Sequence, residues 1–297
     1  MFTRFFHIIR FRILGKSDRN SFKIMDRLVD MLLLKMEAAK GLDLESGESS
    51  YLHQLAHAVE IKNGYVVDIA ASDGFTQSPT LGFYKMGWSG LAVEMDTEKF
   101  SKLSFLYSDF DKVSLARAKI TPLNIVEMLK AFSCPKDFSI LNLDIDSYDL
   151  HVAETLLTNG FRPQIISMEI NEKIPTGVNF SVLYDEDHFW KGDHFYGCSL
   201  DAAASLVKPF DYSLVGLEYN NAFFVVNELA SGNFKDLTTE EAYNSGYVHR
   251  EDRKKKFPAN NDVESWLGLD TESLIIKMNE YFRNYEGMYV LEQSKLS

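Results

Sequence analysis

From Tyr65 onward, short apolar runs alternate with amphipathic stretches, which predicts strands and helices in turn. Strands are predicted at 65–70, 90–94, 113–119, 138–144, 164–169, 212–217 and 221–227, and helices at 76–87, 97–107, 123–132, 148–159 and 199–207. Strands joined by helices are typical of a parallel sheet that is covered on both faces. The last two strands have no room between them for a helix, so we expect them to form a hairpin.

Two segments of different pattern flank this region. Residues 1–60 are predicted to be an N-terminal amphipathic segment followed by helices, and residues 233–297 a C-terminal extension with a helix near Glu272 to Tyr285. Residues 61–232 form the sheet domain, in which 172–198 is too long for a simple connection and is interpreted as a lid or substrate-binding insertion. The predicted fold class is α/β: a Rossmann-like, seven-stranded, mostly parallel sheet with helices on both faces, extended at both ends.

Composition narrows the range of functions. The chain has 297 residues, 45% of them hydrophobic and 25% charged, an ordinary globular mixture with enough residues for a substantial core. The net charge of −12 argues against nucleic acid as the main partner, because phosphate binding depends on clustered Lys and Arg. The two cysteines, Cys134 and Cys198, give neither a disulfide framework nor a metal-binding spacing. We therefore expect a reducing, cytoplasmic location.

The first strand and the turn after it have a shape suited to nucleotide binding. Asp68 lies at the strand end, where a carboxylate can accept hydrogen bonds from loop amides or from a ligand ammonium. The following loop, with Ala70, Ser72, Asp73 and Gly74, is small enough for its backbone to approach a ligand. A helix after Thr76 would turn its amide end towards the same space.

A second carboxylate, that of Glu94, follows twenty residues after Gly74. Glu94 ends the next predicted strand, where it is placed to hydrogen-bond a ribose diol. A dinucleotide site normally needs a G-x-G-x-x-G turn, whereas this turn has one glycine, and Asp68 and Asp73 would repel a pyrophosphate. The same acids suit the ammonium and sulfonium of S-adenosyl-L-methionine. The alternative for the first motif alone is a plain strand with an acid at its rim.

Oxygen ligands are dense where the fourth and fifth predicted strands end. Asp144 and Asp146 follow one strand, and Glu169 and Asn171 follow the other. Because ligands bind beyond the carboxyl ends of such strands, we expect both pairs to face one crevice. An all-oxygen set is the preference of Mg²⁺, which would hold a substrate hydroxyl pair and lower its proton affinity. Helix capping and loop hydrogen bonding are the alternative roles.

Taken in order, these motifs resemble the landmarks of FkbM-type methyltransferases. The resemblance covers roughly 64–227 and rests on 68–74, Glu94, 143–149, 168–171 and 221–225. It implies the class I S-adenosylmethionine-dependent fold and methylation of sugar or natural-product hydroxyls. It also implies Asp68 and Gly74 at the methionine end of the cofactor, Glu94 on its ribose, and Asp144 and Asp146 beside cofactor and substrate. Ala70 departs from the family pattern, which usually has glycine there.

The insertion supplies candidate acceptor-binding groups. It is rich in aromatic residues with interspersed polar groups, which suits stacking on sugar rings or planar acceptors. A histidine over the crevice would take the proton from the attacking hydroxyl, and His188 and His194 are the candidates, ahead of His151. Together with Asp144 they form the predicted catalytic set. For each histidine a structural role is the alternative.

We therefore expect a methyltransferase acting on a small-molecule or glycan hydroxyl, with a peptide acceptor also open. Two other classes are a nicotinamide-dependent oxidoreductase and a non-catalytic interaction module of the same fold. Residues 1–14 alternate aromatic residues with arginines, which fits either packing on the protein or contact with an anionic membrane surface. The apolar stripe from Ser21 to Lys40 fits either a core helix or a homodimer surface.

Overall fold

The computed structural model describes residues 29–33, 35–36 and 47–295. Contacts divide the chain into residues 1–42 and residues 43–297. In the first unit, 29–33 and 35–36 are helical, inside the stretch whose spacing predicts a helix. The predicted membrane-surface segment, residues 1–14, lies outside the described residues. Within the part of the chain that is described, no helix has both the length and the apolar character needed to span a membrane.

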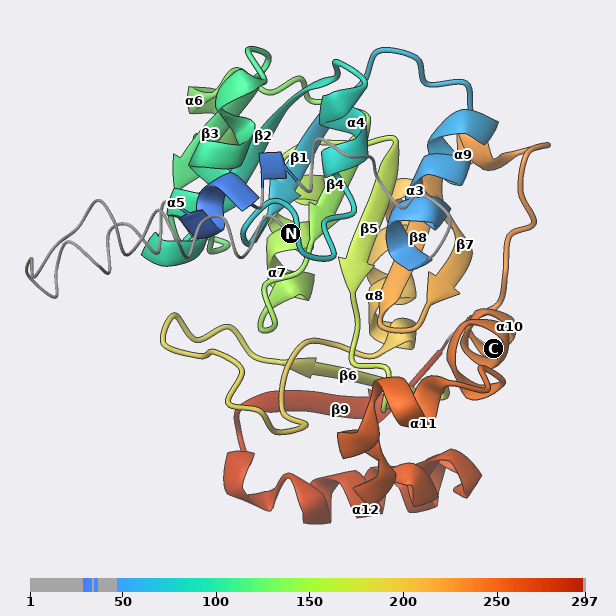
Figure 1. The fold of residues 1–297 in the computed structure, drawn as a ribbon. Coiled ribbons are helices and arrows are strands. Elements are labelled where there is room, and N and C mark those ends of the chain that lie inside the picture. Colours follow the sequence, from blue (N-terminus) through green and yellow to red (C-terminus); the bar gives the residue numbers. More distant parts are fainter. Residues whose placement is uncertain (1–28, 34, 37–46, 296–297) are drawn as a thin grey trace, which may run out of the picture. The chain divides into compact units, whose positions relative to one another are not determined.

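A seven-stranded sheet forms the centre of residues 43–297 (Figure 1). Its strands are β1 (Tyr65–Ile69), β2 (Ser89–Glu94), β3 (Val113–Arg117), β4 (Ile140–Leu143), β5 (Ile165–Glu169), β7 (Tyr212–Glu218) and β8 (Asn221–Val226). Their order is β3-β2-β1-β4-β5-β8-β7; the first five run parallel, and β8 is antiparallel to both β5 and β7. All seven predicted strands and the final hairpin are confirmed. The predicted Rossmann-like, seven-stranded, mostly parallel sheet is therefore confirmed.

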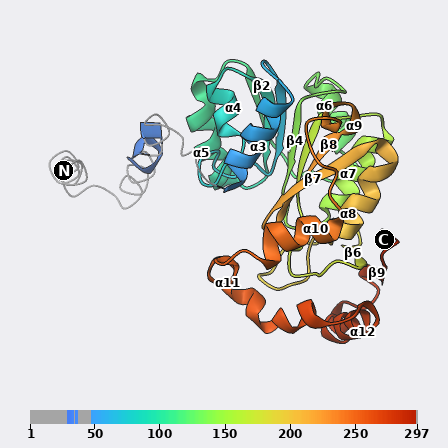
Figure 2. The same cartoon turned by 90° about the vertical axis from the view of Figure 1, so that its right-hand side faces the viewer.

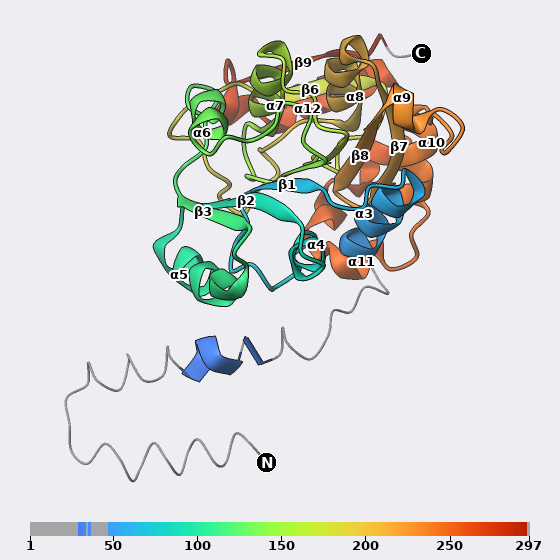
Figure 3. The same ribbon diagram turned by 90° about the horizontal axis from the view of Figure 1, so that it is seen from above.

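Helices cover both faces of the sheet, as Figures 2 and 3 show. One face carries α3 (Gly47–Ala58), α4 (Leu81–Lys85) and α5 (Thr97–Leu106), and the other carries α6 (Ile125–Ala131), α7 (Asp149–Thr158) and α8 (Leu200–Val207). Neighbouring strand residues such as Val66 and Val67 point to opposite faces, yet both are fully buried. Double-sided burial explains why the strands read as continuous apolar runs rather than as alternating ones.

The segment after β1 differs from its prediction. A helix was expected over 76–87, but α4 begins only at Leu81 and has five residues. Pro79 disfavours the helical conformation at Ser78, and Gln77 adopts a positive φ of 55°. Residues 70–80 therefore form a loop at the carboxyl end of β1. The expected helix N-terminus after Thr76 is absent.

A second, two-stranded sheet joins the insertion to the C-terminal extension. β6 (Val178–Val182) pairs antiparallel with β9 (Tyr289–Gln293), and neither strand is predicted by the sequence pattern. The helices that follow β8 are α9 (Asn227–Ala230) and, in the C-terminal extension, α10 (Thr239–Tyr243), α11 (Arg253–Lys256) and α12 (Thr271–Tyr281). Single helical turns lie at Tyr107–Asp109, Lys208–Phe210, Asn244–Val248, Pro258–Asp262, Glu264–Gly268 and Arg283–Tyr285. Figure 1 shows β6, β9 and α12 beyond the carboxyl end of β5.

Candidate active site

A cavity of about 470 Å³ opens at the carboxyl ends of β1, β2 and β4. The strand order reverses between β1 and β4, which is where open α/β sheets bind ligands. The loops after β1 to β4 form most of the wall, and His188 and Phe189 of the insertion complete it. Its size is in the range of small-molecule sites. We call it the main cavity.

Asp68 lies at the floor of this cavity. Its side chain accepts hydrogen bonds from Asn142 Nδ2 at 2.9 Å and from the Thr80 hydroxyl at 2.6 Å. Burial raises the pKa of Asp68, while these two bonds oppose the rise. Asn142 lines the cavity and pairs in register with Asp68 on the neighbouring strand, and its buried Oδ1 has no hydrogen-bond partner among the described residues. Asn142 was not among the predicted site residues, although it stands two positions before Asp144.

Glu94 is fixed at the opposite wall by backbone amides. Its Oε2 accepts from Ser72 N at 2.9 Å, and its Oε1 accepts from Asp96 N at 2.7 Å. Each oxygen keeps a further lone pair for a ligand hydroxyl. The loop that approaches Glu94 bends through left-handed conformations at Ala70 (φ 65°) and Ser72 (φ 52°). Asp68, Ala70, Ser72, Glu94 and Asp144, all predicted for the cofactor, line the cavity.

Asp73 and Gly74, also predicted for the cofactor, do not line the cavity. Asp73 accepts hydrogen bonds from the amides of Phe75 and Thr76 and from the Thr76 hydroxyl, so it closes its own turn. Gly74 has a φ of 75°, and a Cβ there would lie 2.5 Å from a methyl group of Leu103. Both residues shape the loop in this structure.

The structure brings together three of the four predicted metal ligands. Asp144, Asp146 and Glu169 each offer a carboxylate oxygen, and these oxygens lie within 4.8 Å of one another. We call this group the acid cluster. Glu169 Oε1 accepts from Asn220 at 3.0 Å, whereas no N–H or O–H donor of the described residues reaches its buried Oε2, and its hydrogen bonds with Asp144 and Asp146 need a proton on one of the acids. Burial, followed by repulsion from Asp146, raises the pKa of Asp144 to about 7. Three crowded acids favour either a retained proton or a hard cation.

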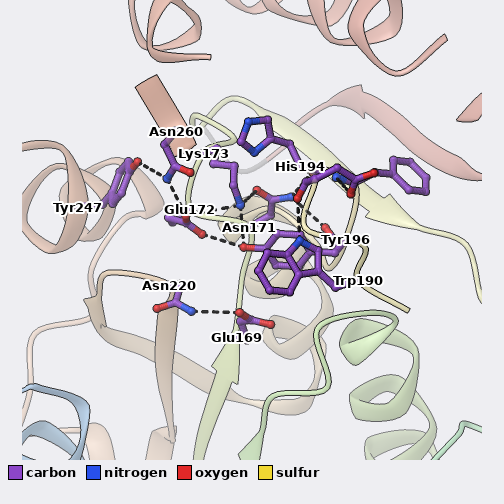
Figure 4. A network of polar contacts seen from close by, with 12 residues as sticks. Glu169, Asn171, Glu172, Lys173, Trp190, His194, Tyr196, Asn220, Tyr247 and Asn260 are labelled. Atoms are coloured by element: carbon purple, nitrogen blue, oxygen red, sulfur yellow. Dashed lines mark hydrogen bonds and ion pairs between the residues drawn. The ribbon is translucent and has the colours of Figure 1, made fainter. Parts of the chain in front are cut away.

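Asn171 is not part of the acid cluster, and Figure 4 shows its side chain among Lys173, His194 and Tyr196, apart from Glu169. Its Nδ2 donates to the carbonyl oxygens of His194 and Tyr196, each at 2.9 Å, and its Oδ1 accepts from Lys173 at 3.3 Å. The side chain thus holds the insertion in place. Asp149 takes the loop hydrogen-bonding role considered for the acids, because it accepts from the amides of Ile145 and Ser147, and no side chain caps α7.

The predicted histidines separate in the structure. His188 lines the main cavity, and its Nδ1 lies 2.5 Å from the Ser147 hydroxyl, which also lines it. Burial lowers the pKa of His188, against a hydrogen bond to the Phe195 backbone that raises it. His194 is buried outside the cavity, with its Nε2 2.7 Å from Asp262 Oδ1. His151 Nε2 lies 3.0 Å from the Val182 carbonyl oxygen, which is a structural contact.

Comparison with known proteins adds the following. No family model matches the chain, and no curated protein matches it. Among solved structures, an O-methyltransferase from Bacillus cereus in complex with SAH is 13% identical, with a TM-score of 0.41 over 72% of this chain and 93% of that one. Magnesium protoporphyrin IX methyltransferase from Synechocystis PCC 6803 with bound SAM is 8% identical, with a TM-score of 0.40 over 72% and 88%. The N-terminal domain of EvdMO1 with SAH bound is 11% identical, with a TM-score of 0.39 over 60% and 80%.

Proposed function

We propose that the protein is an S-adenosyl-L-methionine-dependent O-methyltransferase of the FkbM type, acting on a hydroxyl of a sugar, glycan or natural product. One observation carries the proposal. The cavity at the switch point of the sheet is lined by Asp68, Glu94, Asp144 and Asp146, and its first turn lacks the glycine-rich cradle for a pyrophosphate. A carboxylate-lined cavity suits a cationic donor. The order of the motifs in the chain supports the FkbM type.

The residues present fit this cofactor. S-adenosylmethionine supplies a methyl group already activated on a sulfonium. Glu94, held by two amides, would accept the ribose hydroxyls, and Asp68 with the unpartnered Oδ1 of Asn142 would accept from the ammonium. Lys99 and Lys119 also line the cavity, so its walls carry both signs of charge. The task of the protein is then to align donor and acceptor and to exclude water.

Ser147 and His188 are placed to remove the acceptor proton. If the second ring nitrogen of His188 donates to the Phe195 backbone, Nδ1 is left as the basic nitrogen, facing the Ser147 hydroxyl. A proton leaving the acceptor oxygen would pass to Ser147 Oγ, whose own proton moves to His188 Nδ1. The lowered pKa keeps the imidazole neutral, and therefore basic, near neutral pH.

The acid cluster fits a divalent cation such as Mg²⁺. Asp144, Asp146 and Glu169 supply the carboxylate oxygens that a hard cation prefers, and a cation would replace the proton that these acids otherwise share. The ion would lower the proton affinity of a bound hydroxyl. Thermal unfolding with EDTA and with excess MgCl₂ tests this: a rise in Tm with MgCl₂ that Glu169→Gln abolishes supports the site, and equal Tm values contradict it.

Calorimetric titration with S-adenosylmethionine, SAH and NAD tests the cofactor. We expect S-adenosylmethionine and SAH to bind and NAD not to bind. Glu94→Gln should weaken binding by about 10- to 100-fold, because a charge-assisted hydrogen bond contributes about 1.5–3 kcal/mol. Glu98→Gln, on the exposed side of α5, is the matched control. No binding at millimolar S-adenosylmethionine would remove the enzyme class.

A further inference from the structure

A second cavity of about 200 Å³ adjoins the main cavity. The two share His188 and Phe189 as a common wall. The rest of its lining comes from 185–195 of the insertion and from Tyr285 and Met288 of the C-terminal extension. The seven-stranded sheet contributes nothing to its lining. The parts added to the methyltransferase fold therefore build a cavity directly beside the proposed site of methyl transfer.

One wall of the second cavity is rigid. The rings of Phe195 and Tyr285 stack with their centroids 3.9 Å apart and an angle of 4° between planes. Tyr285 donates its hydroxyl hydrogen to Asp193 Oδ2 at 2.5 Å, and Asp193 Oδ1 accepts from Phe195 N at 3.1 Å. This wall is formed before any ligand arrives, which reduces the entropic cost of binding.

The remaining lining offers groups for a polyhydroxylated ring. Phe189 is 60% exposed, so one aromatic surface is open for contact with an apolar ring face. Within the described residues, the carboxylate of Asp187 has no hydrogen bond or ion pair, and Asp185 uses one oxygen for the Asp187 amide. Such oxygens accept hydrogen bonds from hydroxyls. Residues 185–193 contain four acids and one lysine, so an anionic ligand would be repelled.

We infer that the second cavity binds the sugar unit next to the one that is methylated, so that the acceptor is a neutral glycan or glycoside of at least two rings. The shared wall of His188 and Phe189 joins this subsite to the proton-accepting pair. The inference rests on the proposed methyltransferase function and names the acceptor class for the same site.

Methyl transfer from labelled S-adenosylmethionine to a panel of acceptors tests the inference. The panel contains neutral methyl monosaccharides, the matching disaccharides and trisaccharides, and analogues with a uronic acid as the second ring. We expect kcat/KM to be at least tenfold higher for neutral two-ring acceptors than for single rings. Equal use of one-ring and two-ring acceptors, or preference for the uronic acids, would overturn the inference.

Two variants connect such a preference to the second cavity. Met288→Trp should fill it and reduce kcat/KM for disaccharides to the single-ring value while KM for S-adenosylmethionine is unchanged; Met86→Trp, at an exposed methionine after α4 that lines neither cavity, is the control. Asp187→Asn should improve the use of uronic acids relative to neutral disaccharides. If Met288→Trp keeps the two-ring preference, the subsite is elsewhere.

The panel also separates this inference from the proposed function. Calorimetric binding of S-adenosylmethionine without transfer to any sugar would overturn the glycan inference and leave a methyltransferase with another acceptor. Absence of S-adenosylmethionine binding would overturn both.

Discussion

Two groups of polar residues lie at the same end of β5, and their charges are compensated differently. The acid cluster gathers Asp144, Asp146 and Glu169, and within the described chain no lysine or arginine forms an ion pair with any of them. Two to four positions after β5 ends are Asn171, Glu172 and Lys173, which with Tyr196 and Asn260 form what we call the lysine network (Figure 4). Among the described residues, the first group has no ion-paired cation, although Lys99 and Lys173 lower the pKa of Asp146, whereas the second group contains its own lysine.

The lysine network is satisfied by the protein itself. Lys173 Nζ donates to the Tyr196 hydroxyl at 2.7 Å and lies 3.5 Å from Glu172 Oε1. The two oxygens of Glu172 accept from Asn260 at 2.7 Å and from Tyr196 at 3.0 Å. Asn260 belongs to the C-terminal extension, so this network attaches the extension to the end of β5. A completed polar network indicates scaffold, and an incomplete one at a cavity indicates a ligand site.

The largest effect is expected in the lysine network. Glu172→Ala should lower the free energy of unfolding by about 3–5 kcal/mol, because it leaves the Lys173 ammonium buried without its partner. Glu172→Gln, whose single amide oxygen keeps an acceptor for Asn260 or for Tyr196, should cost less. Urea denaturation measures both. A loss below about 1 kcal/mol in the alanine variant would show that the network does not hold the extension and would remove the contrast with the acid cluster.

In the acid cluster, replacing a carboxylate should instead raise the free energy of unfolding at high pH. Asp144→Asn removes a carboxyl whose pKa is raised from 3.8 to about 7, first by burial and then by Asp146. A raised pKa means that the folded state is favoured by the protonated acid. The contribution of Asp144 is therefore present below about pH 4 and is lost as the pH rises through 7.

At pH 8 the metal-free Asp144→Asn protein should accordingly be more stable than the wild type by about 1–2 kcal/mol, with little difference at pH 4. Excess Mg²⁺ should reverse the order, since only the wild type keeps all three carboxylates. Asp137→Asn, an exposed acid near β4, serves as the control. Chemical denaturation in EDTA across this pH range provides the measurement, and a variant that is less stable at pH 8 would contradict the interpretation of the acid cluster.

The sequence determined the sheet better than the site because burial on both faces leaves a direct apolar signal. The pairing of β6 with β9 has no such signal in the sequence, because each strand has only five residues and more than 100 residues separate the two. Asp68, Glu94 and Asp144 line the cavity, and this position could be predicted because strand ends define the edge of the sheet to which their residues belong.

The positions of Asn171 and His194 could not be predicted in this way. Alternate residues of a strand share a face, so Glu169 and Asn171 were expected to point together. β5 ends at Glu169, however, and the chain then turns into the lysine network, so the alternation does not continue to Asn171. His194 could not be separated from His188 because its partner, Asp262, comes from the C-terminal extension. Contacts between distant segments decide which histidine reaches the cavity.

The smallest effect concerns the loop after β1, where the binding region carries backbone strain that the lysine network lacks. Ala70 has a φ of 65°, a left-handed conformation that costs a residue with a Cβ about 1–2 kcal/mol. Ala70→Gly removes this cost but also makes the unfolded chain more flexible, which offsets part of the stabilisation. The free energy of unfolding should therefore rise by about 0.5–1 kcal/mol.

Ala71→Gly is the control, because Ala71 is a buried neighbour without a positive φ. This variant should instead lower the free energy of unfolding by a similar amount. Thermal and urea unfolding of the two variants side by side give the comparison, and equal losses in both would show that the loop is not strained at Ala70.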